Sequence, residues 1–169
     1  YGLSPLIVSL NFPESDEDIF ISKLLLDKGS DPNFEGVAGI GLGRKHSVTP
    51  LMKASQWGSL EAVKLLLDYG AEVNLQNVSY NTCAISVAIG WQHIDIVKLL
   101  LDKGADISLF NMDGETPYDI ALKEIEECQR KNDKECEEKA RDILKLLNEH
   151  INTIKSKQKT KPEIGILTL

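Results

Sequence analysis

The pattern of hydrophobic and polar positions repeats along the chain. The clearest unit is an apolar run, Lys-Leu-Leu-Leu-Asp, followed by one variable residue and a glycine. It occurs at residues 23–29, 64–70 and 98–104. The second and third runs are 34 residues apart and the first and second are 41 apart, so the spacing predicts inserted residues between the first unit and the second.

A second shared signal lies upstream of each apolar run, and it predicts the start of a helix. It is Thr49-Pro50 in the second unit and Thr116-Pro117 in the fourth. Thr caps a helix well, and Pro fits the first turn, where its missing N–H is no loss. The apolar run then predicts a second helix, and the glycine after it supplies a left-handed stop. Such a helix pair cannot bury its own apolar face, so stacked copies share one core.

The fourth unit differs from the others. Its apolar run, residues 142–147, is degenerate and follows an insertion of about 14 residues relative to the third unit. Residues 122–140 are rich in Glu and Lys, which predicts two lengthened helices with a polar outer face and a break at Asn132-Asp133. We expect one array over residues 1–154, then a basic linker and an apolar tail over 155–169. The expected repeats are roughly 1–33, 34–76, 77–110 and 111–154.

Two insertions interrupt the array. Residues 11–18 are acidic and predict a solvated loop, with Ser15 or Asp16 capping the next helix, although an acidic docking patch is an alternative. Residues 34–47 are rich in glycine, yet their spacing does not fit a phosphate-binding loop and no strand-helix-strand unit surrounds them. They predict an extended finger, to which Val37, Ile40 and Leu42 give an apolar edge.

This pattern resembles the ankyrin repeat, a β-turn and two antiparallel helices in about 33 residues. Segments 57–67 and 111–117 are close to the family pattern, and the resemblance covers roughly residues 1–151. It implies an all-α solenoid of about four helix-turn-helix repeats, with an extended hairpin finger between repeats one and two. The family usually has His two residues after the Pro, which ties repeats together, so its absence predicts a looser stack. This chain has Ile7, Met52, Ser86 and Asp119 there.

The composition limits the choice of partner. The net charge of −7 argues against nucleic acid and against anionic membranes. No apolar run approaches the roughly 20 residues that span a bilayer, and no signal peptide is visible. Cys83, Cys128 and Cys136 are odd in number and lack framework spacing, which predicts reduced thiols in an intracellular, cytoplasmic protein. The lysine-rich repeats also resemble ankyrin proteins that intracellular bacteria secrete into the host cytoplasm.

The resemblance implies binding through the hairpin tips and the exposed, concave face of the first helices. Gln56 and Trp57 fall on that face in repeat two, and Trp91 takes the place of Trp57 in repeat three. Trp and Tyr are enriched at interface hot spots. The alternative is that a Trp just before the inter-helix glycine serves local packing. The candidate binding residues are Trp57, Trp91, Tyr80, Gln56, Lys45, His46, Met112 and Glu115.

We therefore expect a monomeric scaffold that binds another protein or peptide of basic or mixed charge. His93, predicted to cap a helix end, and His150 have no Ser, Cys or carboxylate partner at catalytic spacing. We expect no catalytic site, metal, cofactor or small-molecule substrate. The chain opens at Tyr1, in mid-repeat, which indicates a fragment. One alternative is therefore a targeting domain of a larger enzyme or secreted effector, and another is an architectural spacer.

Overall fold

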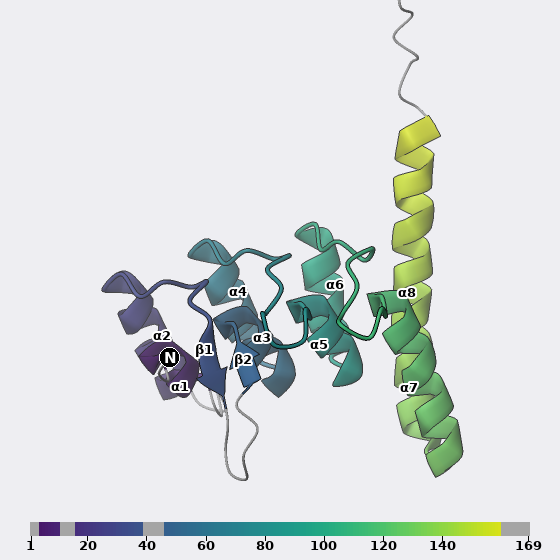
Figure 1. Ribbon diagram of the computed structural model, residues 1–169, viewed down its shortest axis with the longest axis horizontal. Coiled ribbons are helices and arrows are strands. Elements are labelled where there is room, and N and C mark those ends of the chain that lie inside the picture. Colours follow the sequence, from purple (N-terminus) through teal and green to yellow (C-terminus); the bar gives the residue numbers. More distant parts are fainter. Residues whose placement is uncertain (1–3, 11–15, 39–45, 160–169) are drawn as a thin grey trace, which may run out of the picture.

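The computed structural model describes residues 4–10, 16–38 and 46–159. Within them, helix pairs stand side by side in chain order, as predicted for an all-α solenoid (Figure 1). First helices contact first helices along the array, and second helices contact second helices. The first helices are α1 (Pro5–Ser9), α3 (Pro50–Trp57), α5 (Ala84–Gly90) and α7 (Pro117–Lys131). The second helices are α2 (Asp16–Asp27), α4 (Leu60–Asp68), α6 (Ile94–Asp102) and α8 (Lys134–Lys159).

The Thr-Pro signals start helices as predicted. Thr49 Oγ1 accepts a hydrogen bond from the N–H of Met52 at 3.2 Å. Thr116 forms a capping box with Asp119, in which the Thr116 N–H donates to Asp119 Oδ2 at 2.9 Å. Hydrogen bonds from Thr116 hold the pKa of the Asp119 carboxyl below its usual range. Asp119, which stands at the family's histidine position, thus stabilises its own helix.

One apolar core runs through the whole stack. Small residues at corresponding positions of the first helices, Ala54, Ala88 and Ala121, are all buried, which lets neighbouring helices approach closely. Leu66 and Leu100 of the leucine runs are also buried, with aliphatic side chains of the first helices against them. Each run ends at a left-handed glycine, with φ of 87° at Gly29 and Gly70 and 86° at Gly104, as predicted.

Asparagine side chains tie successive turns together, and the sequence reasoning missed them. Asn33 Nδ2 donates to the carbonyl of Gly70 at 3.1 Å, and its Oδ1 accepts from the N–H of Glu72 at 2.7 Å. Asn74 repeats both bonds one repeat later, with the carbonyl of Gly104 at 3.2 Å and the N–H of Asp106 at 2.8 Å. These bonds supply inter-repeat hydrogen bonding that the missing histidines were expected to provide.

His93 adds a further tie between repeats two and three. It is the N-cap residue of α6, but its side chain makes no hydrogen bond to that helix, and the helix end that it caps is the last turn of α3. Its Nε2 instead lies 3.1 Å from the carbonyl oxygen of Gln56. The ring also covers Gly58, where a Cβ atom would lie 2.5 Å from His93 Cε1. The imidazole therefore reaches the previous repeat rather than its own helix.

The fourth pair is lengthened as predicted, with Asn132 in the left-handed conformation between α7 and α8. Two details differ from expectation. Cys128 and Cys136 form a disulfide instead of remaining thiols, because the antiparallel helices bring their Cα atoms within 5.6 Å. The helix α8 continues to Lys159, beyond the predicted start of the linker at residue 155, and extends past α6 (Figure 1). Residues 160–169 of the predicted tail lie outside the described part of the chain.

The base of the predicted finger is an antiparallel pair, β1 (Gly36–Ala38) and β2 (His46–Val48). Ser47 of β2 is bonded to the next tip: its N–H donates to Ser79 Oγ at 2.9 Å, and its carbonyl accepts from Asn77 Nδ2 at 2.6 Å. Residues 39–45, with Ile40 and Leu42 of the expected apolar edge, lie outside the described residues. So do residues 11–15 of the acidic insertion.

Candidate partner-binding surface

Two tryptophans end the first helices of adjacent repeats. Trp57 is the last residue of α3 and Trp91 is the C-cap of α5, and each precedes a left-handed residue, Gly58 or Gln92. The side chain of Trp57 is 38% exposed and that of Trp91 is 58% exposed. The core therefore leaves part of each indole ring exposed, and a partner can cover that area.

Lys53 lies against the Trp57 ring, and the sequence reasoning did not select it. It is only 6% exposed, and its Nζ lies 5.2 Å from the centre of the Trp57 ring and 3.4 Å from Gln56 Oε1. Burial lowers the pKa of its amine. The signal in the sequence was a lysine at a position that is Val8, Val87 or Ile120 in the other repeats. We name Lys53, Gln56, Trp57 and Trp91 the tryptophan surface.

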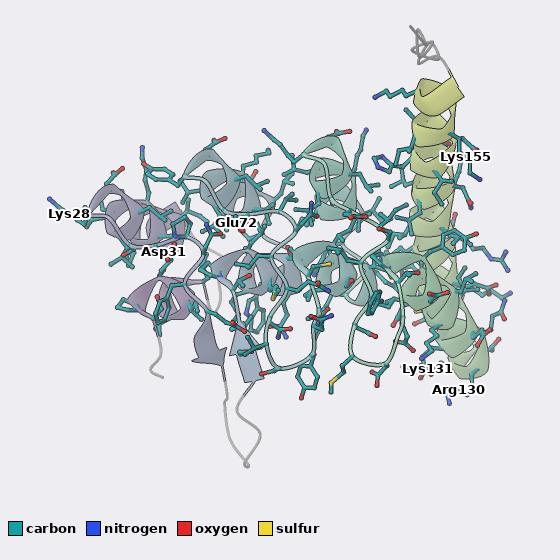
Figure 2. The ribbon with its side chains drawn as sticks, turned by 45° about the horizontal axis from the view of Figure 1, so that its top comes forward. Lys28, Asp31, Glu72, Arg130, Lys131 and Lys155 are labelled. Atoms are coloured by element: carbon teal, nitrogen blue, oxygen red, sulfur yellow. A yellow bond between two sulfur atoms is a disulfide. The ribbon has the colours of Figure 1, made fainter. Side chains whose placement is uncertain are left out.

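Repeat four continues this side of the array with charge in place of aromatic rings. The position of Trp57 corresponds to Glu124, and α7 continues through it because Ile125 stands where Gly58 ends α3. Arg130 and Lys131, near the far end of α7, both pair with Glu127. Figure 2 shows these two residues at one end of the α7–α8 hairpin and Lys155 toward the opposite end of α8.

Glu115, a predicted tip contact, is engaged within the chain. Its carboxylate pairs with Lys123 and accepts a hydrogen bond from Asn111 Nδ2 at 3.1 Å. Its backbone N–H donates to Asn111 Oδ1 at 2.9 Å. Glu115 therefore shapes the repeat-four tip, and a partner would reach its carboxylate only in competition with Lys123.

Apolar side chains cluster on the tips of repeats three and four. Tyr80 and Met112, both predicted, are exposed and joined through their backbones, with the Met112 N–H donating to the Tyr80 carbonyl at 2.9 Å. Phe110 and Val78, which the sequence reasoning did not select, are exposed beside them in the chain. Gln76 Nε2 and Asn81 Nδ2 each donate to the Phe110 carbonyl at 3.0 Å. We name Val78, Tyr80, Phe110 and Met112 the tip row.

The remaining predicted tip contacts are described only in part. Lys45 lies outside the described residues, and for His46 the structure gives the backbone alone, as the first residue of β2. The structure therefore groups Gln56 with Trp57, and Tyr80 with Met112, while the finger's contribution stays a prediction.

The part of the chain that the structure describes contains no group of His, Cys, Asp and Glu placed to hold a metal ion. Among the same residues, no helix is long and apolar enough to cross a membrane. A hollow of about 340 Å³ lies at the inter-helix turns. It is lined by Gly58, Leu60, Gln92, His93, Ile94, Asp95, Ile96 and Lys139.

Family models match most of the stacked helix pairs. A model described as ankyrin repeats (3 copies) matches residues 1–77, and one described as ankyrin repeat matches residues 80–112. The chain belongs to the ankyrin-repeat family. Ankyrin repeats are generally protein-interaction modules and typically non-catalytic, so this array is a protein-binding one. No curated protein matches the chain.

The fourth ankyrin helix pair lies beyond the matched residues. Its first helix lacks the inter-helix glycine, its second helix has a degenerate leucine run, and the insertion lengthens both. In the structure α7 nevertheless contacts α5, and α8 contacts α6. The ankyrin stack therefore extends one pair further than its sequence signature.

Proposed function

We propose that this ankyrin array binds a protein or peptide by covering the tryptophan surface, with the tip row as a second contact. The observation that supports the proposal is the pair of exposed rings at corresponding positions of adjacent repeats. Lys53 supports it further, because a buried amine is retained beneath Trp57 where other repeats have aliphatic side chains. Trp side chains bury large areas at small cost in entropy, which suits them to recognition.

Charge favours a partner of basic or mixed charge. The chain has a net charge of −7, and a face of α7 carries three glutamates with two cations: Lys123, Glu124, Glu126, Glu127 and Arg130. A basic side chain of the partner would find carboxylates there, on the first helix that follows α5. The negative net charge also makes nucleic acid and anionic membranes poor ligands.

Substitution of the two tryptophans tests this site. We expect Trp57→Ala/Trp91→Ala to weaken binding of a partner captured by the native chain at least tenfold, because hot-spot truncations cost about 2 kcal/mol or more. The measurement is affinity capture with mass spectrometry, followed by calorimetry on the purified partner. Circular dichroism and thermal melting establish that the variant is folded.

Leu122→Ala is the matched control, since Leu122 is an exposed apolar residue on the following first helix. It should leave affinity unchanged. If the double tryptophan variant binds as tightly as the native chain while Tyr80→Ala/Met112→Ala loses binding, the tip row is the site and the tryptophan surface is not.

The compartment in which the array works is a separate question. The predicted cytoplasmic placement depended on reduced cysteines, and the Cys128–Cys136 disulfide argues for an oxidising environment instead. Rapid alkylation of the protein in its native cells, followed by mass measurement, would count free thiols. We expect one, the buried Cys83; three free thiols would restore the cytoplasmic placement.

A further inference from the structure

The amine of Lys53 has no carboxylate partner among the described residues. Its Nζ lies 3.4 Å from Gln56 Oε1 and 5.2 Å from the centre of the Trp57 ring, and both groups belong to its own helix, α3. An ammonium group has several N–H donors, and a single amide oxygen occupies only one of them. Removing a cation from water without an ionic partner is costly. The amine therefore carries a charge that is not neutralised and donors that remain for an anion.

The groups that cover this amine are surface side chains. Val87 and Ile120, at the corresponding positions of the next two first helices, are half-buried although each has neighbouring repeats. Lys53 itself is only 6% exposed, but the groups placed against its amine come from Trp57, which is exposed, and Gln56, which is half-buried. Rotamer changes of surface side chains are common on binding. A ligand can therefore reach the amine without any movement of the helices.

Gly90 leaves an open place on the next first helix, α5. Its counterparts are Gln56 on α3 and Lys123 on α7, which both have long side chains. Apart from its chain neighbours and its own helix backbone, a Cβ atom at Gly90 would have no described atom within 4 Å. The left-handed residue of this turn is Gln92, not Gly90. Because glycine weakens a helix, neither packing nor backbone geometry within the described chain accounts for its presence.

The two unexplained positions lie on adjacent helices of one surface. The helix α3 contacts α5, and Gly90 precedes Trp91 as Gln56 precedes Trp57. A position without a side chain allows another backbone to approach closely. A cation with free donors binds an anion. One extended chain that crosses α3 and α5 would satisfy both, with its backbone over Gly90 and an acidic side chain at Lys53.

A carboxylate fits this position better than a phosphate. Lys53 offers one positive charge within a chain of net charge −7, so it balances a carboxylate but not the second charge of a phosphate group. The tryptophan surface also has no arginine, the residue that proteins use most for phosphorylated peptides. We propose, building on the partner-binding function above, that Lys53 and Gly90 form a subsite for an acidic residue of a linear peptide segment. An Asp or Glu carboxylate of the segment binds the Lys53 amine, and its backbone passes over Gly90.

This subsite also orders the charges of the partner. Glu124 takes the position of Trp57 on α7, the first helix that follows α5. Basic residues of the segment therefore belong on the repeat-four side of its acidic residue. The partner is then a segment of mixed charge rather than a uniformly basic one.

Selection from a displayed library of random linear peptides tests the subsite. The library is presented in parallel to the native chain and to Lys53→Met, which keeps the apolar stem and suits a position that is aliphatic in the other repeats. We expect the native chain to select peptides that share an Asp or Glu, and Lys53→Met to lose this preference. Lys64→Met is the matched control, since Lys64 is an exposed lysine of α4, and should select the same peptides as the native chain.

Calorimetry on one selected peptide then measures the pairing. Replacing the shared acid of the peptide by the corresponding amide should weaken binding to the native chain about tenfold and leave binding to Lys53→Met unchanged. Gly90→Gln, which copies the residue of repeat two, should also weaken binding about tenfold, because its side chain occupies the path of the peptide backbone. Circular dichroism establishes that both variants are folded.

Three results would overturn the proposal: an acidic preference that persists with Lys53→Met, an amide peptide that loses affinity equally for both chains, or a library from which the native chain selects nothing. Full affinity of Gly90→Gln would overturn the placement of the backbone. The proposed function stands apart from these outcomes. It survives them if Trp57→Ala/Trp91→Ala still loses the partner captured by the native chain, so the two failures are distinguishable.

Discussion

Lys53 is a buried amine in a row of positions that the other repeats fill with aliphatic side chains. Its hydrogen bond to Gln56 and its contact with the Trp57 ring compensate only part of the cost of removing a cation from water. Burial lowers its pKa in the folded state, so the folded chain binds protons less tightly than the unfolded chain. The free-energy cost of burying the charged amine is therefore present in full below the folded-state pKa of Lys53. It disappears as the pH rises through the ordinary lysine pKa, where the amine is neutral in both states.

We expect Lys53→Met to raise the free energy of unfolding by about 1 kcal/mol at neutral pH. The gain should shrink as the pH approaches the ordinary lysine value of 10.5, because the native amine then loses its charge. Denaturant unfolding at several pH values measures it, with Lys64→Met, at an exposed lysine of the next helix, as the control. Loss of stability in Lys53→Met would show that the amine contributes more to the fold than its burial costs.

Among whole elements, α3 to α6 were predictable because their signals are local. A leucine run and a glycine stop lie within each pair and need no knowledge of the neighbours, and Thr49-Pro50 starts α3. The start of α5 at Cys83-Ala84 follows from the repeat register instead. The end of α8 was not predicted, because the polar and basic composition of residues 155–159 indicates a linker. Lys, Ser and Gln are tolerated in helices, and residues 134–161 contain no Gly or Pro, so the helix continues to Lys159.

The same distinction applies to the candidate site. The positions of Trp57 and Trp91 follow from the repeat register, which is sequence information. The burial of Lys53 and the exposure of Phe110 depend on how neighbouring helices and tips pack, which no single repeat specifies. The disulfide could have been found from geometry: Cys128 and Cys136 lie at equal distances on either side of Asn132, so they face each other across the turn of the helical hairpin.

At the level of the helical hairpin, we expect reduction of this disulfide to destabilise repeat four. A short loop closed by a disulfide contributes about 2–3 kcal/mol through the entropy of the unfolded chain. Gln92 Nε2 also donates to both sulfurs, at 3.3 Å and 3.1 Å, and links the hairpin to repeat three. A phosphine reductant should lower the midpoint of thermal unfolding by about 5–10 °C.

Cys128→Ala/Cys136→Ala provides the comparison. It should melt near the reduced native chain and no longer respond to reductant, whereas Cys83→Ala should respond as the native chain does. An unchanged midpoint on reduction would mean that packing of α7 against α5 and α8, rather than the disulfide, sets the stability of this pair.

In the whole molecule, the asparagine ties connect repeats one to two and two to three, and then stop. The position of Asn33 and Asn74 is Ser108 in repeat three, and its side chain bonds back to Asp106 in the same turn. The junction between repeats three and four instead depends on the tip bonds to Phe110, the Tyr80–Met112 bond and the contact of Gln92 with the disulfide. The asparagine tie is therefore confined to the first two junctions, whereas tip bonds also join repeats two and three, through Ser47 and Ser79.

We expect Asn74→Ala to lower the free energy of unfolding by about 1–2 kcal/mol, because it removes two inter-repeat hydrogen bonds at once. Asn33→Ala should behave alike. Ser108→Ala is the matched control, since it removes no bond between repeats, and should cost less than about 0.5 kcal/mol. Hydrogen exchange of the Glu72 and Asp106 amides would report each tie separately; equal protection in the native chain and the variants would contradict this role.

Each asparagine tie also has a consequence for how such repeat arrays evolve. The side chain of Asn33 or Asn74 contacts only a carbonyl and an N–H of the next turn, groups that nearly any residue supplies. The asparagine tie therefore does not depend on which side chains the neighbouring repeat carries. For this tie alone, a repeat can be duplicated, deleted or exchanged by recombination without a compensating mutation, whereas the Tyr69–Asp27 hydrogen bond and the His93 ring over Gly58 need matching residues in both repeats. The junction to repeat four also uses backbone groups, since Gln76 and Asn81 donate to the Phe110 carbonyl and the Met112 N–H donates to the Tyr80 carbonyl. The contact of Gln92 with Cys128 and Cys136, in contrast, requires two particular side chains in the neighbouring repeat.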